Sequence, residues 1–436
     1  MGTPVTTQFS IDVSWLQALH GPNEIRETAA SLQITIGGKT ATRVEDGWSK
    51  SVQLASRVSA YPLALWIVSS WWRLRWESQP FRSAPDVSWR MAHEMPAAGH
   101  GFLWPLLTFE SDGEEIGVIC RPSDPLSEEP LWYLADFRET IPASSFEHTI
   151  DRFVNLVIAR LDAVGVGSTQ LHELWSDVQE ERSDPSLSRT RKLEAQLGFE
   201  PEEAPRDLLI RLDDLSHKAG LAAVAELAPV CAGPQPEKTL TDIEDFSGAH
   251  GPEAHISLPC LSAEQVSYSD VPWERGWKVA QELRTACKLG PWAMSDEDLA
   301  NVLQIPTQTL QKPSMAPGRL PLGLAIRNGQ KDHLKLLFRK QNRPALRFEA
   351  ARFLAEHVLA PTEDAWLPAT DTRTARQKVQ RAFATEFLCP FSALMNFLDG
   401  DFSPEAIDDA GDHFGVSELA VKSHLANHRQ IPFDSA

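Results

Sequence analysis

Two stretches near the C-terminal end decide the fold of this chain. Residues 347–357 read RFEAARFLAEH, and residues 377–390 read QKVQRAFATEFLCP. We interpret them as the main parts of two helices, over residues 346–358 and 374–388. These helices are expected to form the core of a C-terminal domain that covers residues 272–436.

The segments around this helix pair predict a mostly helical domain with a small sheet. Two short apolar runs flank Asn328-Gly329, a dipeptide typical of turns, and predict two strands. Near the end of the chain, Gly415 stands in the turn of a helix–turn–helix pattern. The elements expected around the pair are helices over 272–289 and 296–303, strands over 322–326 and 334–338, and helices over 404–414 and 418–426.

The rest of the chain predicts further domains, because 436 residues are too many for one ordinary core. Residues 1–140 hold nine of the 14 tryptophans and two expected hairpins, which turn near Gly37 and Gly113. We expect a Trp-rich α+β domain there. Residues 141–231 are expected to form an acidic helical region, and residues 232–271, rich in Gly, Pro, Ser and acids, a linker. The fold class is therefore multidomain α+β.

The composition limits where the chain is expected to work. Hydrophobic residues make up 42% of it, which is ample for globular packing, yet no apolar run approaches the roughly 18–20 residues that span a bilayer. No secretory signal is visible at the N-terminus. The five cysteines are scattered without a CxxC pair, which argues against a disulfide framework and a cysteine zinc knuckle. We expect a cytoplasmic protein without a membrane partner.

The formal net charge of −19 is unevenly distributed. Residues 101–269 hold 12 Lys and Arg against 31 Asp and Glu, whereas residues 319–352 hold nine basic residues against two acidic ones. An acidic chain is a poor general binder of nucleic acid, because phosphate groups repel it. The basic run predicts either a solvated face with internal pairing or a strip that binds phosphate or an acidic partner. The strip would contain Arg327, Lys331, Lys335, Arg339, Lys340 and Arg343.

Three motifs, in order over residues 275–430, resemble those of the ImmA/IrrE family of prokaryotic metallopeptidases. The family's R-F-x-x-A-H-E-x-x-H helix carries the zinc site, and its start is matched here by Arg347-Phe348 and Ala351. A later helix, roughly E-x-x-A-N-x-F-A-x-x-L-L-M-P, supplies a third, acidic ligand and is matched by Phe383-Ala384, Glu386-Phe387-Leu388 and Cys389-Pro390. The following I-A-x-x-F-x-V-S segment is matched by Ile407, Phe414, Val416-Ser417 and Val421. The resemblance implies a zincin-like fold for the C-terminal domain.

The residues that carry the family's chemistry are replaced in this chain. Two histidines one turn apart and a neighbouring glutamate are needed to hold Zn²⁺ and to activate its water. In this alignment the histidine positions hold Arg352 and Glu356, the general-base position holds Phe353, and the third ligand falls at about Gln377. Arginine stays protonated and brings a fixed positive charge to the place of the cation. No HExxH occurs in the chain, so we predict a pseudo-peptidase with no catalytic residues, metal or cofactor.

The altered zinc position allows three interpretations. Arg352 and Glu356 have the spacing of an ion pair that would plug the site. A retained pocket for an acidic group and residual hydrolysis are the alternatives. The residues expected to line such a pocket or to contact a partner are Arg347, His357, Arg381 and Glu386.

We therefore expect a non-catalytic regulatory protein whose partner is another protein, encoded nearby. The resemblance implies a role in prokaryotic stress response, toxin–antitoxin pairs or phage defence. One alternative is an active metallopeptidase with a displaced zinc site. The other is a nucleic-acid-linked regulator or an acidic nucleic-acid mimic. The tryptophans of the N-terminal domain would stack bases in that last case, but core packing is the favoured interpretation.

Overall fold

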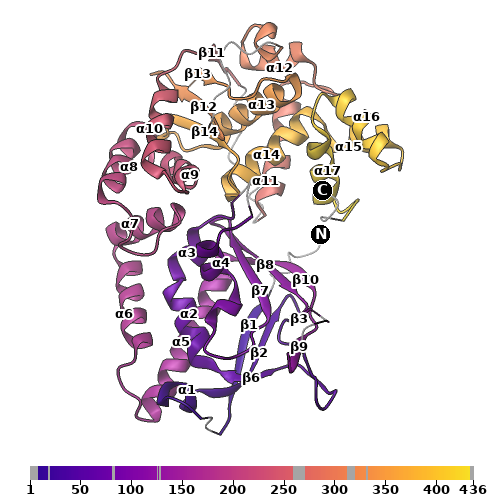
Figure 1. Cartoon of the computed structure of the whole chain (residues 1–436). Coiled ribbons are helices and arrows are strands. Elements are labelled where there is room, and N and C mark those ends of the chain that lie inside the picture. The colour runs from indigo at the N-terminus through magenta and orange to yellow at the C-terminus, as the bar shows by residue number, and fades with distance from the viewer. Residues whose placement is uncertain are drawn as a thin grey trace. The chain divides into compact units, whose positions relative to one another are not determined.

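The structure is a computed structural model of the chain, shown in Figure 1. It describes residues 8–17, 20–80, 84–124, 126, 129–258, 271–311, 320–329 and 332–432. The chain forms two compact units, Met1–Pro205 and Arg206–Ala436. Helices and small antiparallel sheets occur in both units, so the multidomain α+β class is confirmed. Within the described residues, no helix combines the length and the apolar character that crossing a membrane requires.

The described part of the first unit contains three antiparallel sheets. In the largest, the predicted hairpin turns at Gly37 and Gly38, whose φ angles of 59° and 78° suit glycine. The predicted turn near Gly113 joins two strands of the second sheet. The strands are β1 (Phe9–Trp15), β2 (Ala29–Ile36), β3 (Lys39–Thr40) and β6 (Ser56–Ser59) in the first sheet, β7 (Leu106–Ser111), β8 (Glu115–Arg121) and β10 (Phe137–Pro142) in the second, and β4 (Val44–Asp46), β5 (Val52–Gln53) and β9 (Leu131–Tyr133) in the third.

One apolar core joins the first two sheets of the first unit to most of its helices. Trp66, Trp71, Trp72 and Trp104 are each 7% exposed or less, so the expected core packing of the tryptophans is confirmed for these four. The helices are α1 (Asn23–Glu27), α2 (Ala60–Ser69), α3 (Trp71–Trp76), α4 (Val87–His93), the 3₁₀ turn η1 (Met95–Ala98), α5 (Ala143–Ala163), α6 (Gln170–Ser183) and α7 (Pro185–Gln196).

The boundary between the two units differs from the predicted domain boundaries. Helix α5 buries its apolar face in the core of the first unit, where Phe146 stacks on Phe9 of β1 with 5.9 Å between ring centroids. A boundary at residue 140 would therefore cut through one core. The segment expected to be a separate helical region is divided instead, with α5, α6 and α7 in the first unit and the helices after residue 205 in the second.

The second unit begins with three helices and contains a four-stranded antiparallel sheet of order β11-β13-β12-β14. Two of its elements lie in the segment expected to be a linker: a helix that buries Leu240 and Ile243, and a strand in which Ala254 pairs with Leu334. Residues 259–270 of that segment lie outside the described residues. The elements are α8 (Arg206–Ala219), α9 (Leu221–Cys231), α10 (Pro236–Ser247), β11 (Glu253–His255), β12 (Leu322–Arg327), β13 (His333–Leu337) and β14 (Trp366–Thr370).

The predicted helix pair lies at the centre of the second unit as α13 and α14 (Figure 1). Helix α11 packs closely on α14 because it has a glycine there: a Cβ on Gly276 would lie 2.4 Å from the carbonyl oxygen of Val379. The remaining elements are α11 (Pro272–Ala286), α12 (Asp296–Leu303), the 3₁₀ turn η2 (Thr307–Leu310), α13 (Arg343–Leu359), α14 (Ala375–Leu388), α15 (Phe391–Leu398), α16 (Pro404–Phe414) and α17 (Glu418–Asn427).

Candidate functional site

Helices α13 and α14 bring buried polar side chains together. Each begins at a capping side chain, Asn342 for α13 and Thr374 for α14, which accepts a hydrogen bond from a backbone N–H of the first turn. Buried polar groups are costly unless they are hydrogen-bonded, so their partners define the site. The polar side chains at the centre of the pair, each 4% exposed or less, are Arg352, Glu356, Gln377 and Gln380.

Arg352 is held by three acceptors and not by a carboxylate. Its Nε donates to Oε1 of Gln380 at 3.2 Å. Its Nη2 donates to the carbonyl oxygen of Thr370 at 2.7 Å and also to Oε1 of Gln377. Burial and the nearby charges of Arg381 and Arg339 lower the pKa of Arg352 to about 9, so the guanidinium remains a buried cation at neutral pH.

Glu356 pairs with a residue of α14 instead of Arg352. Nε of Arg376 lies 3.0 Å and 3.1 Å from its two carboxylate oxygens. Gln380 donates from Nε2 to Oε1 of Glu356 at 2.6 Å while accepting from Arg352. The amide of Gln380 therefore stands between the two charged groups, which replaces the ion pair expected from their spacing on α13.

Gln377 uses both ends of its amide. Its Oε1 accepts from Arg352 and from the backbone N–H of Thr370 at 2.8 Å. Its Nε2 donates to the carbonyl oxygen of Pro368 at 3.1 Å and to Oε2 of Glu226, on α9, at 2.9 Å. Burial raises the pKa of Glu226. The polar network consequently reaches from α13 across α14 to β14 and α9.

These residues do not fit a metal ion at the positions where the resemblance places zinc. Arg352 is a cation without a lone pair to offer. Phe353 packs in the apolar core, 5.4 Å from Phe338 between ring centroids. Both groups of the Gln377 amide are already engaged in hydrogen bonds, and Glu356 is paired with Arg376. The position is closed by a polar network.

The other residues named as pocket or partner contacts are mostly internal. Arg347 is 1% exposed and donates to Asp296 and to the carbonyl oxygen of Gly415 at 3.2 Å. Arg381 donates to the carbonyl oxygen of Thr372 at 3.0 Å. His357 is 5% exposed. Their burial and their internal hydrogen bonds indicate that these side chains stabilise the second unit.

Most side chains of the predicted basic strip make hydrogen bonds or ion pairs within the second unit. Arg327 donates to the carbonyl oxygens of Pro361, Thr362 and Asp364, and Lys335 donates to that of Ser247. Arg339 and Arg343 pair with Asp371 and Asp296. Lys340 is partly buried, and Lys331 lies outside the described residues. The interpretation as internal pairing fits these arginines better than a phosphate-binding face does.

A second cluster of polar side chains lies at the opposite end of α14. Glu386, His424 and His428 each present a ligand atom, and these atoms all lie within 4.8 Å of one another. Glu386 was expected to be a pocket residue, but the two histidines were not singled out from the sequence. The signal for them is the His424-x-x-x-His428 spacing, which places both imidazoles on one face of a helix. This segment lacks the glutamate that follows the first histidine in HExxH, so it does not match that motif.

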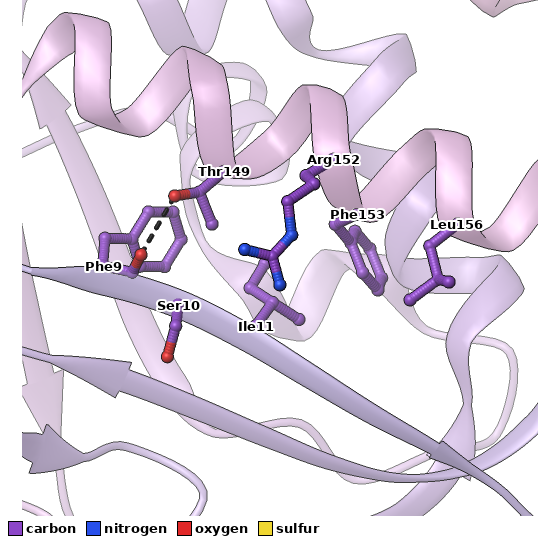
Figure 2. A pocket seen from close by; sticks show the side chains of 7 residues that line it. All are labelled: Phe9, Ser10, Ile11, Thr149, Arg152, Phe153 and Leu156. Carbon is purple, nitrogen blue, oxygen red and sulfur yellow. Dashed lines mark hydrogen bonds between the residues drawn. The ribbon is translucent and has the colours of Figure 1, made fainter.

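A small pocket of the first unit is a weaker candidate for a binding site (Figure 2). It encloses about 40 Å³ between β1 and α5 and is lined by Phe9, Ser10, Ile11, Thr149, Arg152, Phe153 and Leu156. Thr149 donates to the carbonyl oxygen of Phe9 at 3.0 Å, and Arg152 extends from the helix toward the strand. This volume is far below the roughly 300 Å³ at which ligand pockets begin.

Comparison of the chain with family models, with curated proteins and with solved structures finds no match.

Proposed function

We propose that the second unit contains a degenerate metallopeptidase domain of the ImmA/IrrE type, which does not hydrolyse peptides and acts by binding a protein partner. The observation that carries this proposal is the position of Arg352. Thr370, Gln377 and Gln380 hold a buried cation at the position to which the resemblance assigns the first zinc-binding histidine. The neighbouring Phe353 has no proton to exchange with a water molecule.

The hydrogen bonds of the polar network support a structural role for this position. Gln380 and Gln377 each donate and accept within it, so both amides are already engaged with other residues of the protein. The proposal places the protein in the cytoplasm, where the free thiols Cys120, Cys231, Cys287 and Cys389 stay reduced.

Two exposed tryptophans support binding of another protein. Trp48, in the β4–β5 turn of the first unit, is 88% exposed, and Trp292, between α11 and α12 of the second, is 70% exposed. Tryptophan is among the residues most enriched at the energetic centres of protein interfaces. The internal pairing of the basic run removes the main support for a nucleic-acid partner.

Hydrolysis is tested with the full chain and a complex peptide mixture. The chain is incubated with Zn²⁺ and a peptide library, and the products are identified by mass spectrometry. We expect no cleavage beyond that of the buffer, for the native chain and for Glu356→Gln alike. Cleavage that a zinc chelator abolishes would overturn the proposal.

Partner binding is tested by quantitative co-purification from the native host. The native chain is compared with Trp48→Ser and with Trp292→Ser, which change one exposed side chain in each unit. We expect a specific protein to be enriched with the native chain and lost with one of the two variants. Equal recovery with all three chains would remove the tryptophans from the interface, and enrichment of nucleic acid instead of protein would favour the alternative function.

A further inference from the structure

The Glu386, His424 and His428 side chains have the composition of a metal site. Glu386 comes from α14, while His424 lies in α17 and His428 directly follows that helix. Two imidazoles four residues apart at the end of a helix, joined by a carboxylate from another helix, form a ligand set that Zn²⁺ takes in proteins. We propose that these three residues bind a divalent transition-metal ion of the zinc type. This site goes beyond the proposed function and does not depend on it.

The distances agree with ligands arranged around one ion. Metal–ligand bonds of about 2.1 Å at tetrahedral angles place donor atoms about 3.4 Å apart. Nε2 of His424 lies 3.2 Å from Oε2 of Glu386. All three ligand atoms lie within 4.8 Å of one another, so small side-chain rotations bring them to bonding distance of a shared ion.

The nitrogen atoms give an independent reason to expect a ligand. His424 is 1% exposed, yet within the described structure neither its Nδ1 nor its Nε2 has a hydrogen-bond partner, and the same holds for Nε2 of His428. Nε2 of His424 is close to Glu386 but is not oriented for a hydrogen bond with it. Buried polar atoms are rarely left without partners, and a metal ion satisfies several of them at once.

The surroundings hold the three side chains in place. Gln281 donates to Oε1 of Glu386 at 2.9 Å, and the backbone N–H of Phe391 donates to Oε2 at 3.1 Å. The His428 ring is stacked between Phe391 and Trp277, with centroid distances of 3.6 Å and 3.9 Å. Such outer contacts orient metal ligands and tune their affinity.

The ligand types and location define the class of ion and its role. Imidazole and carboxylate suit zinc and neighbouring first-row metals better than calcium or magnesium, which prefer oxygen ligands only. The metal would tie the C-terminal end of α17 to α14, two elements that are far apart in sequence. We therefore assign it a stabilising role.

The test is metal binding by the untagged full chain, freed of metal with a chelator and then desalted. Zn²⁺ is added in competition with a chromophoric zinc indicator. We expect one tightly bound Zn²⁺ per chain and an affinity at least about 100-fold lower in Glu386→Gln and in His428→Gln, since each loses a ligand. Gln281→Met, which removes an outer contact from an exposed position, is expected to weaken binding by about 10- to 100-fold.

The matched control is His413→Gln, because His413 is an exposed histidine of the same unit outside the cluster. It should bind Zn²⁺ like the native chain. Loading with Co²⁺ should give no thiolate charge-transfer band, since no cysteine is a proposed ligand. Sub-stoichiometric binding, or binding that survives in both Glu386→Gln and His428→Gln, would overturn the site. Circular dichroism of each variant shows whether it is folded.

The two proposals can fail separately. Zinc binding without peptide hydrolysis supports both. Hydrolysis that requires zinc and is lost in Glu386→Gln would keep the metal site and overturn the non-catalytic function, whereas absence of both zinc binding and hydrolysis would overturn the site alone.

Discussion

Helix α14 buries polar groups at both of its ends, and the two ends differ in how those groups are satisfied. At the first, Gln377 and Gln380 donate and accept within a network that includes Arg352 and Glu356. At the second, Glu386 faces imidazole nitrogens that lack hydrogen-bond partners in the described structure. Burial of polar residues alone therefore does not identify a binding site. The informative property is whether the protein itself completes their bonding.

The largest expected effect comes from removing the charge that balances the first end. Arg376 pairs with both Glu356 and Asp364, so Arg376→Leu leaves two buried carboxylates without their cation. We expect a loss of about 3–5 kcal/mol in the free energy of unfolding, measured by urea titration. A loss below about 1 kcal/mol would show that the network is hydrated and contributes little.

The second-largest effect is expected from zinc, which should stabilise the protein through the Glu386 end of α14 only. At free Zn²⁺ of about 100 times the dissociation constant, binding to the folded state alone adds about 2.7 kcal/mol to the free energy of unfolding. We expect this gain in the native chain and not in Glu386→Gln, measured as a shift of the urea midpoint. A gain of the same size in Glu386→Gln would place the metal elsewhere.

The Gln380 amide, which links Arg352 to Glu356 at the first end, can be removed without changing a residue of the second end. Gln380→Leu deprives Arg352 of one acceptor and Glu356 of one donor, so we expect a loss of about 1–3 kcal/mol. The variant should still bind Zn²⁺ with native affinity. Replacement of the exposed Gln430 by Leu, the matched control, should change stability by less than about 0.5 kcal/mol. Loss of zinc binding in Gln380→Leu would show that the two ends are coupled.

The smallest effect is expected for a pair on the surface of α17. Lys422 and Glu418 lie 2.7 Å apart at helical spacing and are both partly exposed. Lys422→Met should cost about 0.3–0.5 kcal/mol, because exposed pairs are screened by water and salt. A cost comparable to that of Arg376→Leu would mean that burial is not what separates these interactions.

Local sequence patterns were sufficient to locate the central helices. The structure places them at Arg343–Leu359 and Ala375–Leu388, close to the expected ranges of 346–358 and 374–388. Strand β14 was not expected, because Pro368 lies in it and proline weakens a strand pattern. It is tolerated because β14 is an edge strand of its sheet.

The site was harder to predict, because its partners come from distant elements. The spacing of Arg352 and Glu356 on α13 predicts a local ion pair, yet their partners lie on α14 and β14. Likewise, His424 stands 38 positions after Glu386, and nothing in the spacing of the chain shows that α17 returns to α14. Only the i, i+4 relation of the two histidines was visible in the sequence.

The bonding of Arg352 also limits how this protein can evolve. Gln377 bonds Arg352, Arg352 bonds Gln380, and Gln380 bonds Glu356, so a change at one position leaves its direct partner with an unmet bond. The effects of changes within this chain of contacts are therefore not additive. A lineage that acquires histidine at position 352 would carry a less stable intermediate before the other positions could adapt. The four residues are therefore expected to be inherited as a set and replaced as a set.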